Sequence, residues 1–222
     1  MLLVRKYTSV PIPTLYAMFQ NPSTGANFII MENVPGTPLN TCYAALDDVQ
    51  KASIGSQLRQ SLGELRSIPA PGFYGLPGRR PYLPGQSWIF KDQAGPFHSA
   101  DEFLDTYFRA QFSSASDSSQ ADIKELQSQF RALSQSHNAP VFTHADLQAQ
   151  NIILRDNGSI CVIDWESAGF YPAYFEFFIY GTYTMATSGL EKDERDTILE
   201  YGDMVALILK VWSTYIESEG GP

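Results

Sequence analysis

The sequence predicts an α+β fold in which a small N-terminal β-hairpin lobe precedes a mainly α-helical lobe that carries a second β-hairpin. Two pairs of short apolar runs, each pair interrupted by a turn sequence, predict the hairpins. Longer segments whose apolar residues recur at helical spacing predict the helices. With 222 residues, of which 44% are hydrophobic, the chain is long enough to bury a substantial core.

The first lobe is predicted to span residues 1–36. Its first ten residues are typical of the end of a helix, because two prolines follow directly. Two strand-like runs, residues 15–20 and 27–32, flank the turn sequence Asn-Pro-Ser-Thr-Gly and predict a β-hairpin. The Pro- and Gly-rich segment that begins at Asn33 predicts a hinge into the second lobe, residues 37–222.

Helices dominate the predicted second lobe. Amphipathic runs predict helices over residues 48–68, 100–112, 122–134 and 193–216. The segment 69–98 is rich in Gly, Pro and aromatic side chains, and a loop of this length inside a domain is often functional. Its aromatic residues could line a substrate pocket or form a hydrophobic cluster beneath the loop. They are Phe73, Tyr74, Tyr82, Trp88 and Phe90.

The second hairpin follows a short predicted strand over residues 141–143. Its own strands are expected over residues 151–154 and 160–163, because the turn sequence Asp-Asn-Gly separates these two apolar runs. A hairpin brings its two open ends together. Asn151 at the first end and Asp164 just after the second should therefore be neighbours.

Four polar residues are associated with this hairpin: His144, Asp146, Asn151 and Asp164. Asp and Asn side chains supply the hard oxygen ligands that Mg²⁺ prefers while it keeps waters and substrate phosphates. Two carboxylates held close together repel each other, which favours a bound cation or a raised pKa on one of them. We therefore expect Asn151 and Asp164 to hold a metal ion and Asp146 to act as a base or a positioning group.

The motif His144-x-Asp146-x-x-x-x-Asn151, followed by Ile-Asp-Trp-Glu at residues 163–166, resembles the catalytic and metal-binding loops of the aminoglycoside phosphotransferase and choline kinase superfamily. Members of that superfamily are similar in fold to protein kinases. The resemblance implies that Asp146 accepts or orients a substrate hydroxyl, and that Asn151 and Asp164 bind Mg²⁺. It covers nearly the whole chain, and residues 165–176 are similar to the continuation of this motif in fungal members.

The same resemblance implies a nucleotide site at the hinge. Residues 28–35 resemble the strand and hinge that contact an adenine ring through backbone groups, which assigns Met31, Glu32, Asn33 and Val34 to ATP. Family members also carry a nucleotide-covering loop, a strand-borne Lys that binds phosphate, and a helix Glu that pairs with this Lys. No counterpart of these elements precedes the first hairpin, so a bound ATP would lack that cation and that cover.

The matching loops and the reduced first lobe leave three functions open. The chain could transfer a phosphoryl group from Mg·ATP to a hydroxyl of a small metabolite, with a second copy or a partner protein completing the cleft. It could be repurposed for acid–base chemistry in natural-product metabolism, such as cyclisation, dehydration or elimination, at His144, Asp146 and Asp164. It could also be a pseudokinase whose exposed hairpin edge binds a partner.

Two polar residues have both structural and functional interpretations. His144 could act directly in acid–base chemistry, because its side chain titrates near neutral pH, or it could brace the loop through hydrogen bonds. Glu176 lies in the aromatic-rich sequence Tyr-Phe-Glu-Phe-Phe, and a carboxylate in such surroundings requires a buried partner such as an Arg.

The composition excludes several other classes of protein. The chain has 15 Lys and Arg against 24 Asp and Glu, and a net charge of −9 opposes binding to a nucleic-acid backbone. Cys42 and Cys161 stand alone, without metal-binding spacing. The apolar run at the start is too short for a signal peptide, and residues 204–209 are too few to span a membrane. We therefore expect a cytoplasmic protein that binds neither membranes nor nucleic acid.

Overall fold

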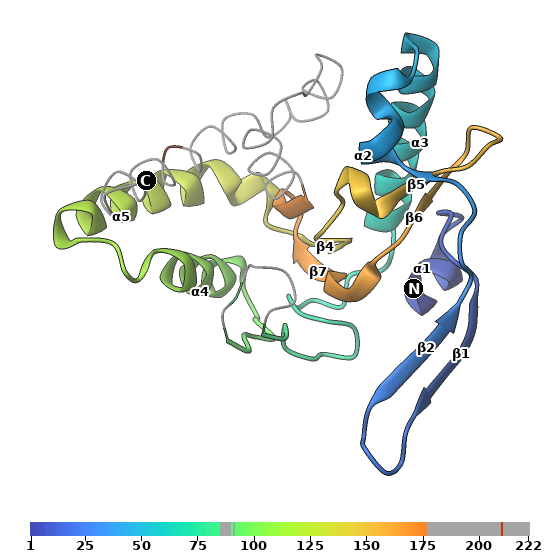
Figure 1. Cartoon of the computed structure of the whole chain (residues 1–222). Coiled ribbons are helices and arrows are strands. Elements are labelled where there is room, and N and C mark those ends of the chain that lie inside the picture. The colour runs from blue at the N-terminus through green and yellow to red at the C-terminus, as the bar shows by residue number, and fades with distance from the viewer. Residues whose placement is uncertain (85–89, 91, 177–209, 211–222) are drawn as a thin grey trace. The chain divides into compact units, whose positions relative to one another are not determined.

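The computed structural model describes residues 1–84, 90, 92–176 and 210 (Figure 1). The chain divides into two compact units. The first combines residues 1–68 with 147–165, and the second combines residues 69–146 with the chain from Glu166 onward. Apart from Lys210, which is helical, the helix predicted over residues 193–216 lies outside the described residues.

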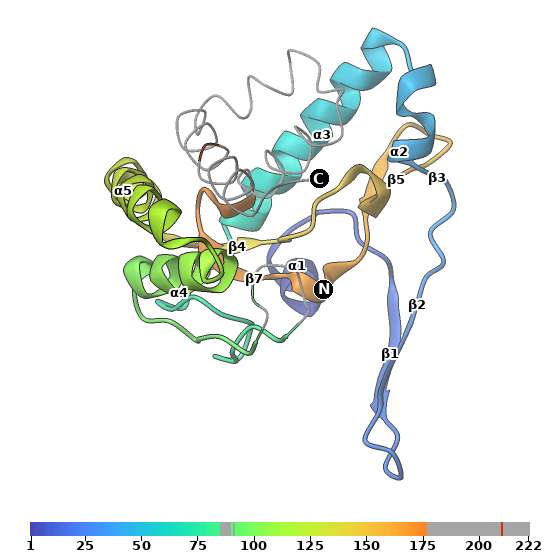
Figure 2. The ribbon, with the colours of Figure 1, turned by 60° about the vertical axis from the view of Figure 1, so that its left-hand side comes forward.

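The first unit opens with helix α1 (Leu2–Tyr7) and the hairpin of β1 (Leu15–Gln20) and β2 (Asn27–Met31), as predicted. The two strands pair antiparallel, and their register is irregular between Leu15 and Ala17. Figure 2 shows this hairpin as a long ribbon that extends away from the helices of the same unit. The hairpin sequence therefore folds locally but does not join a larger sheet among the described residues.

A three-stranded antiparallel sheet in the order β3–β5–β6 forms the centre of the first unit. Its strands are β3 (Thr37–Pro38), β5 (Ile152–Leu154) and β6 (Ile160–Val162). Gly36 adopts a φ of 141°, and a Cβ on it would lie 2.4 Å from the carbonyl oxygen of Leu154. Only glycine permits this close approach of the hinge to β5. The sequence did not predict β3, which consists of just two residues.

Two helices pack against this sheet. They are α2 (Leu39–Cys42) and α3 (Asp48–Arg66), and α3 begins with a capping box between Asp47 and Gln50. The buried core between helices and sheet consists of Leu39, Ile54, Ile152 and Ile160. On α3, Leu65 is buried together with Ile54 and Ser61, and Leu58 is half-buried and packs against this core.

The second unit contains helices α4 (Ala100–Phe112) and α5 (Asp117–Ser134) and a two-stranded sheet. Strands β4 (Pro140–Thr143) and β7 (Gly169–Pro172) pair antiparallel, with Thr143 opposite Gly169. Helix α4 has the predicted bounds, whereas α5 begins five residues earlier than predicted. Strand β7 was not predicted, because its pairing partner lies far away in sequence.

An aromatic cluster forms the core of the second unit, with Phe103 of α4 at its centre. The ring of Phe103 lies 5.3–6.2 Å from the rings of Tyr74, Tyr82, Phe90, Phe97, Tyr171 and Phe175. Tyr82 also donates a hydrogen bond of 2.6 Å from its hydroxyl to the carbonyl of Phe170. The buried aromatic residues of the long loop therefore support the cluster interpretation over the pocket interpretation; Trp88 lies outside the described residues.

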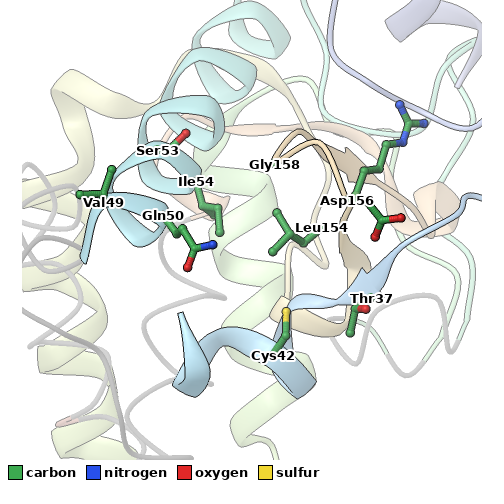
Figure 3. A pocket seen from close by; sticks show the side chains of 10 residues that line it. Thr37, Cys42, Val49, Gln50, Ser53, Ile54, Leu154, Asp156 and Gly158 are labelled. Carbon is green, nitrogen blue, oxygen red and sulfur yellow. The ribbon is translucent and has the colours of Figure 1, made fainter. Parts of the chain in front are cut away.

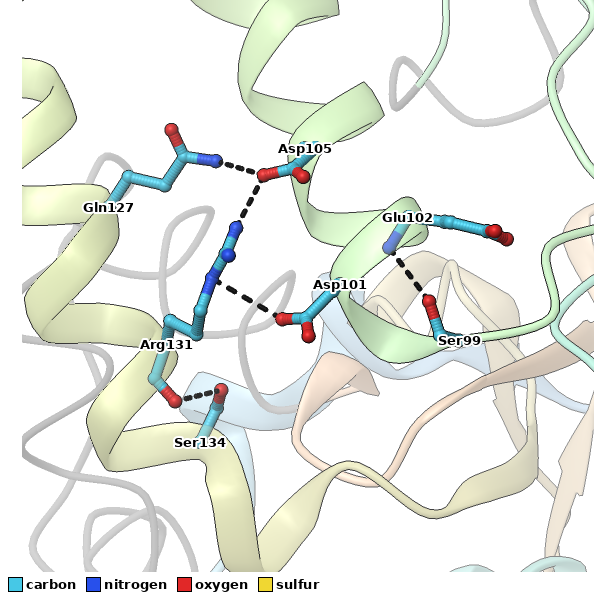
Figure 4. Close-up of polar contacts among 7 residues, drawn as sticks. All are labelled: Ser99, Asp101, Glu102, Asp105, Gln127, Arg131 and Ser134. Atoms are coloured by element: carbon cyan, nitrogen blue, oxygen red, sulfur yellow. Dashed lines mark hydrogen bonds and ion pairs between the residues drawn. The ribbon is translucent and has the colours of Figure 1, made fainter.

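A polar network joins α4 to α5 on the surface of the second unit (Figure 4). Arg131 of α5 forms ion pairs with Asp101 at 3.3 Å and with Asp105, and Gln127 donates to Asp105 at 2.8 Å. These side chains are partly exposed, so solvent screens the ion pairs and each stabilises the fold only slightly. The network links the exposed sides of the two helices.

Candidate functional site

The loop after β4 carries His144 and Asp146 in the second unit. The Glu176 carboxylate accepts hydrogen bonds from the backbone N–H groups of His144, at 2.7 Å, and of Ala145, at 3.2 Å. His144 and Ala145 are fully buried, and Glu176 is only 5% exposed. Ala145 takes a left-handed φ of 63°, a conformation that costs energy for a residue with a side chain. The buried carboxylate stabilises this strained turn.

His144 takes part in the same loop through its ring. Its Nδ1 accepts a hydrogen bond of 3.2 Å from the backbone N–H of Asp146. An imidazole that accepts at Nδ1 and has no solvent exposure is well placed to hold the loop, so this geometry favours the bracing role. Asp146 itself is half-buried, and its backbone position is set directly by His144.

Glu176 was the residue whose role the sequence predicted least well. Its aromatic neighbours indicated a buried carboxylate with a partner, but the proposed partner was an Arg side chain. The structure gives it backbone N–H groups of the loop, 31 and 32 residues away. No local pattern in the sequence indicates a contact over that separation.

Asn151 and Asp164 lie at the open end of the β5–β6 hairpin in the first unit. The backbone N–H of Ile163 donates to the carbonyl of Asn151 at 2.9 Å, so the two ends meet as expected. Asn151 is buried in a short 3₁₀ turn (Ala149–Asn151) rather than in the strand itself. Asp164 is exposed and adopts a left-handed φ of 61°.

This pair of side chains has the donor chemistry of a magnesium site. Within residues 1–84, 90, 92–176 and 210, no group of three or more His, Cys, Asp or Glu side chains is arranged to hold a metal. A carboxylate and a carboxamide fit Mg²⁺ nevertheless, because this ion commonly takes one or two protein oxygens together with phosphates and waters. Asn151 and Asp164 would hold the ion, and it would supply charge stabilisation to a phosphate.

The hinge residues follow β2 in the first unit. The backbone N–H of Glu32 donates to the carbonyl of Thr14 at 2.8 Å, so this N–H is already used within the hairpin. The Glu32 carboxylate accepts from the Thr14 backbone N–H at 2.9 Å and lies 3.5 Å from Nη2 of Arg155. Glu32 thus connects the base of the first hairpin with β5–β6, while Met31 and Asn33 are exposed.

The hydrogen bonds from Thr14, and to a smaller degree the charge of Arg155, lower the pKa of Glu32 below its ordinary value. Ionised Glu32 therefore stabilises the fold at pH values above the pKa that Glu32 has in the unfolded chain. This stabilisation is lost as the pH falls through the lower pKa that Glu32 has in the folded chain. Glu32→Gln should lower the melting temperature near neutral pH, and the difference from wild type should shrink towards acid pH. Glu125→Gln, on the exposed face of α5, is the control. A constant difference across the pH range would contradict this prediction.

A pocket of about 430 Å³ lies at the other end of the β5–β6 hairpin (Figure 3). It is bounded by the hinge, by α2, by the start of α3 and by the hairpin turn, and the Cys42 sulfur faces into it. Its lining includes Gln50, Ser53, Leu154 and Asp156. Because these residues surround the hairpin turn, the pocket is separate from the open end that carries Asn151 and Asp164.

The two hairpins, the hinge, the HxD loop and the Asp after the second hairpin occur in the order expected for a kinase-like fold. The model of the phosphotransferase enzyme family (APH) matches residues 1–203, and the chain belongs to this family. A comparison with curated proteins gives no match.

Solved structures share this fold at low sequence identity. The apo form of a thermostable mutant of aminoglycoside phosphotransferase APH(4)-Ia is 16% identical, with a TM-score of 0.61; the match covers 98% of this chain and 72% of that chain. The GDP and kanamycin complex of APH(2")-IIia is 17% identical, with a TM-score of 0.60 and coverage of 99% and 72%. A ternary complex of an APH(4)-Ia variant with AMP-PNP and hygromycin B is 15% identical, with a TM-score of 0.59 and coverage of 98% and 72%. The predicted α+β, kinase-like fold is therefore confirmed.

None of the helices in the described part of the chain is both long enough and apolar enough to cross a membrane.

Proposed function

We propose that this protein transfers the terminal phosphoryl group of a purine nucleoside triphosphate to a hydroxyl group of a small molecule. The observation that carries the proposal is the pair of loops at His144–Asn151 and Asp164 in a chain of the phosphotransferase family. Each of these loops holds one residue in the left-handed region, Ala145 and Asp164. Strained residues of this kind concentrate at functional sites, because only a constrained surrounding structure retains them.

Each residue has a distinct role in this proposal. Asp146 orients the acceptor hydroxyl and takes its proton as the new phosphate ester bond forms, while the bond between the β- and γ-phosphates breaks and the nucleoside diphosphate leaves. Asn151 and Asp164 hold Mg²⁺ against the nucleotide phosphates. The carbonyl of Glu32 and the backbone of Asn33 and Val34 contact the purine ring, and Met31 precedes them at the end of β2. His144 and Glu176 keep the loop in place.

The acceptor class follows from charge and from the family. Similar structures contain kanamycin or hygromycin B, which makes hydroxylated small molecules the first acceptors to examine. The chain carries a net charge of −9, which attracts cationic acceptors and repels anionic ones over the range of salt screening. We therefore propose a polyhydroxylated small molecule, neutral or cationic, as the substrate.

Asp164→Ala is expected to weaken nucleotide binding at least tenfold in the presence of Mg²⁺, because the ion loses its carboxylate ligand. Calorimetric titration with AMP-PNP and with GDP, each with Mg²⁺ and with EDTA, measures this effect. Wild type should bind more weakly in EDTA, whereas Asp164→Ala should respond little to Mg²⁺. Asp156→Ala removes an exposed carboxylate from the turn of the same hairpin and should behave as wild type.

Absence of nucleotide binding up to millimolar concentration would reject phosphoryl transfer by this chain. The protein would then be screened with aromatic and polyketide-like metabolites, as the acid–base alternative requires. If nucleotide binds, incubation with ATP or GTP and hydroxylated amines, beginning with kanamycin and hygromycin B, identifies the acceptor. A phosphate monoester detected by mass spectrometry would establish the reaction.

A further inference from the structure

The β1–β2 hairpin exposes apolar side chains on both of its faces. Every residue of β2 is exposed, with Ile29 at 56% and Ile30 at 51%. A two-stranded hairpin in water is only marginally stable by itself, and an apolar patch of this kind marks an interaction surface. The exposed apolar residues are Tyr16, Met18, Phe19, Phe28, Ile29, Ile30 and Met31.

The same hairpin lies in a stretch without charge. Residues 7–31 contain no Asp, Glu, Lys, Arg or His, although the whole chain has a net charge of −9. Two copies of such an acidic chain repel each other at most orientations, but this stretch lets them meet without opposing like charges. Natural sheet edges are usually protected by Lys, by Pro or by a bulge, and β2 has none of these.

The pairing register indicates which backbone groups of β2 are free for a further strand. The Asn21 N–H donates to Ala26, and the Glu32 N–H donates to Thr14. Along an antiparallel pair of strands, opposite residues that exchange backbone hydrogen bonds alternate with opposite residues that do not. In this register, Phe28 and Ile30 direct their N–H and C=O groups towards β1. The N–H and C=O groups of Asn27, Ile29 and Met31 therefore point to the other edge of β2, which has no partner strand in the described part of the chain. The other edge, on β1, is interrupted by the irregularity between Leu15 and Ala17.

We propose that β2 pairs antiparallel with β2 of a second copy of this chain, which gives a four-stranded sheet across a twofold axis. The axis passes beside Ile29, so that Ile29 lies opposite Ile29 of the second copy and Asn27 lies opposite Met31. All three outward-facing residues then exchange backbone hydrogen bonds with their counterparts. Phe28 lies opposite Ile30, and such an aromatic and β-branched pair stabilises a sheet.

This dimer is independent of the proposed phosphoryl transfer. The pairing ends at Met31, and the backbone of Glu32–Val34 beyond it remains available to a purine ring. Nucleotide titration and oligomeric state therefore test separate properties of the chain.

Two proline variants test the pairing. Ile29→Pro removes an N–H that faces the free edge of β2 and leaves the ladder to β1 intact. Met18→Pro is the matched control: Met18 pairs directly with Ile29, so its N–H faces the opposite edge, on β1. Light scattering after size exclusion, over a series of protein concentrations, gives the mass of each form. Wild type and Met18→Pro should have twice the monomer mass of 24.7 kDa, and Ile29→Pro should have the monomer mass.

Three results would each overturn the proposal. A wild type that stays monomeric at every concentration has no such interface. An Ile29→Pro variant that remains dimeric does not use the β2 edge. Equal dissociation of both variants would mean that the dimer depends on the hairpin being folded and not on this edge.

Discussion

Asp146→Asn is expected to lower the rate of phosphoryl transfer by about 10²–10⁴-fold, which is the usual contribution of a positioned acid–base group. The amide has the same shape as the carboxylate but cannot take the proton of the acceptor hydroxyl. The contact from the Asp146 backbone N–H to Nδ1 of His144 does not involve the side chain, so the loop should keep its conformation. Asp146→Asn should therefore lower kcat and leave the KM for nucleotide nearly unchanged.

The measurement is the initial rate of phosphate ester formation with the acceptor identified by mass spectrometry. Where transfer is slow, nucleotide hydrolysis, with water as the acceptor, gives a second rate. Asp122→Asn makes the same chemical change on the exposed surface of α5 in the same unit and should keep the wild-type rate. Full activity of Asp146→Asn would remove both the kinase and the acid–base interpretation of this loop.

Glu176→Leu should lower the free energy of unfolding by about 2–6 kcal/mol. The substitution removes the acceptor of two buried backbone N–H groups, and each buried donor left without a partner costs about 1–3 kcal/mol. A loss of this size is a large fraction of the stability of a typical domain. Glu176→Gln keeps an oxygen that can accept these hydrogen bonds, so it should lower the free energy of unfolding clearly less than Glu176→Leu does.

Denaturant titration followed by circular dichroism measures both variants, and Glu125→Leu on the exposed face of α5 is the control. The role of Glu176 in holding the loop has a kinetic consequence as well. Glu176→Gln should lower kcat more than it changes nucleotide affinity, because the strained turn at Ala145 orients Asp146. Equal stability of the Gln and Leu variants would contradict the proposed hydrogen-bonding role.

Much of the local structure could be predicted from short segments of sequence. The first hairpin, α4 and the β5–β6 hairpin occur where their turn and periodicity signals lie, because residues close in sequence determine these elements. The meeting of the ends of the second hairpin, where Ile163 bonds to Asn151, belongs to this group, since a short turn brings the two ends together. Elements that depend on distant partners were predicted poorly or not at all. Strand β3 pairs with β5 across more than a hundred residues, and β7 pairs with β4 and bridges through Phe170 to Gly75, which is more distant from β7 in sequence than β4 is.

The sequence by itself determined the order of the elements, the family resemblance and the identity of the candidate residues Asp146, Asn151 and Asp164. Only the tertiary structure decided that His144 is buried with its ring against the loop backbone, and that Glu176 serves as the acceptor of that loop. The physical reason is that a buried polar group must be satisfied by a partner, and the chain may take that partner from any distance in sequence.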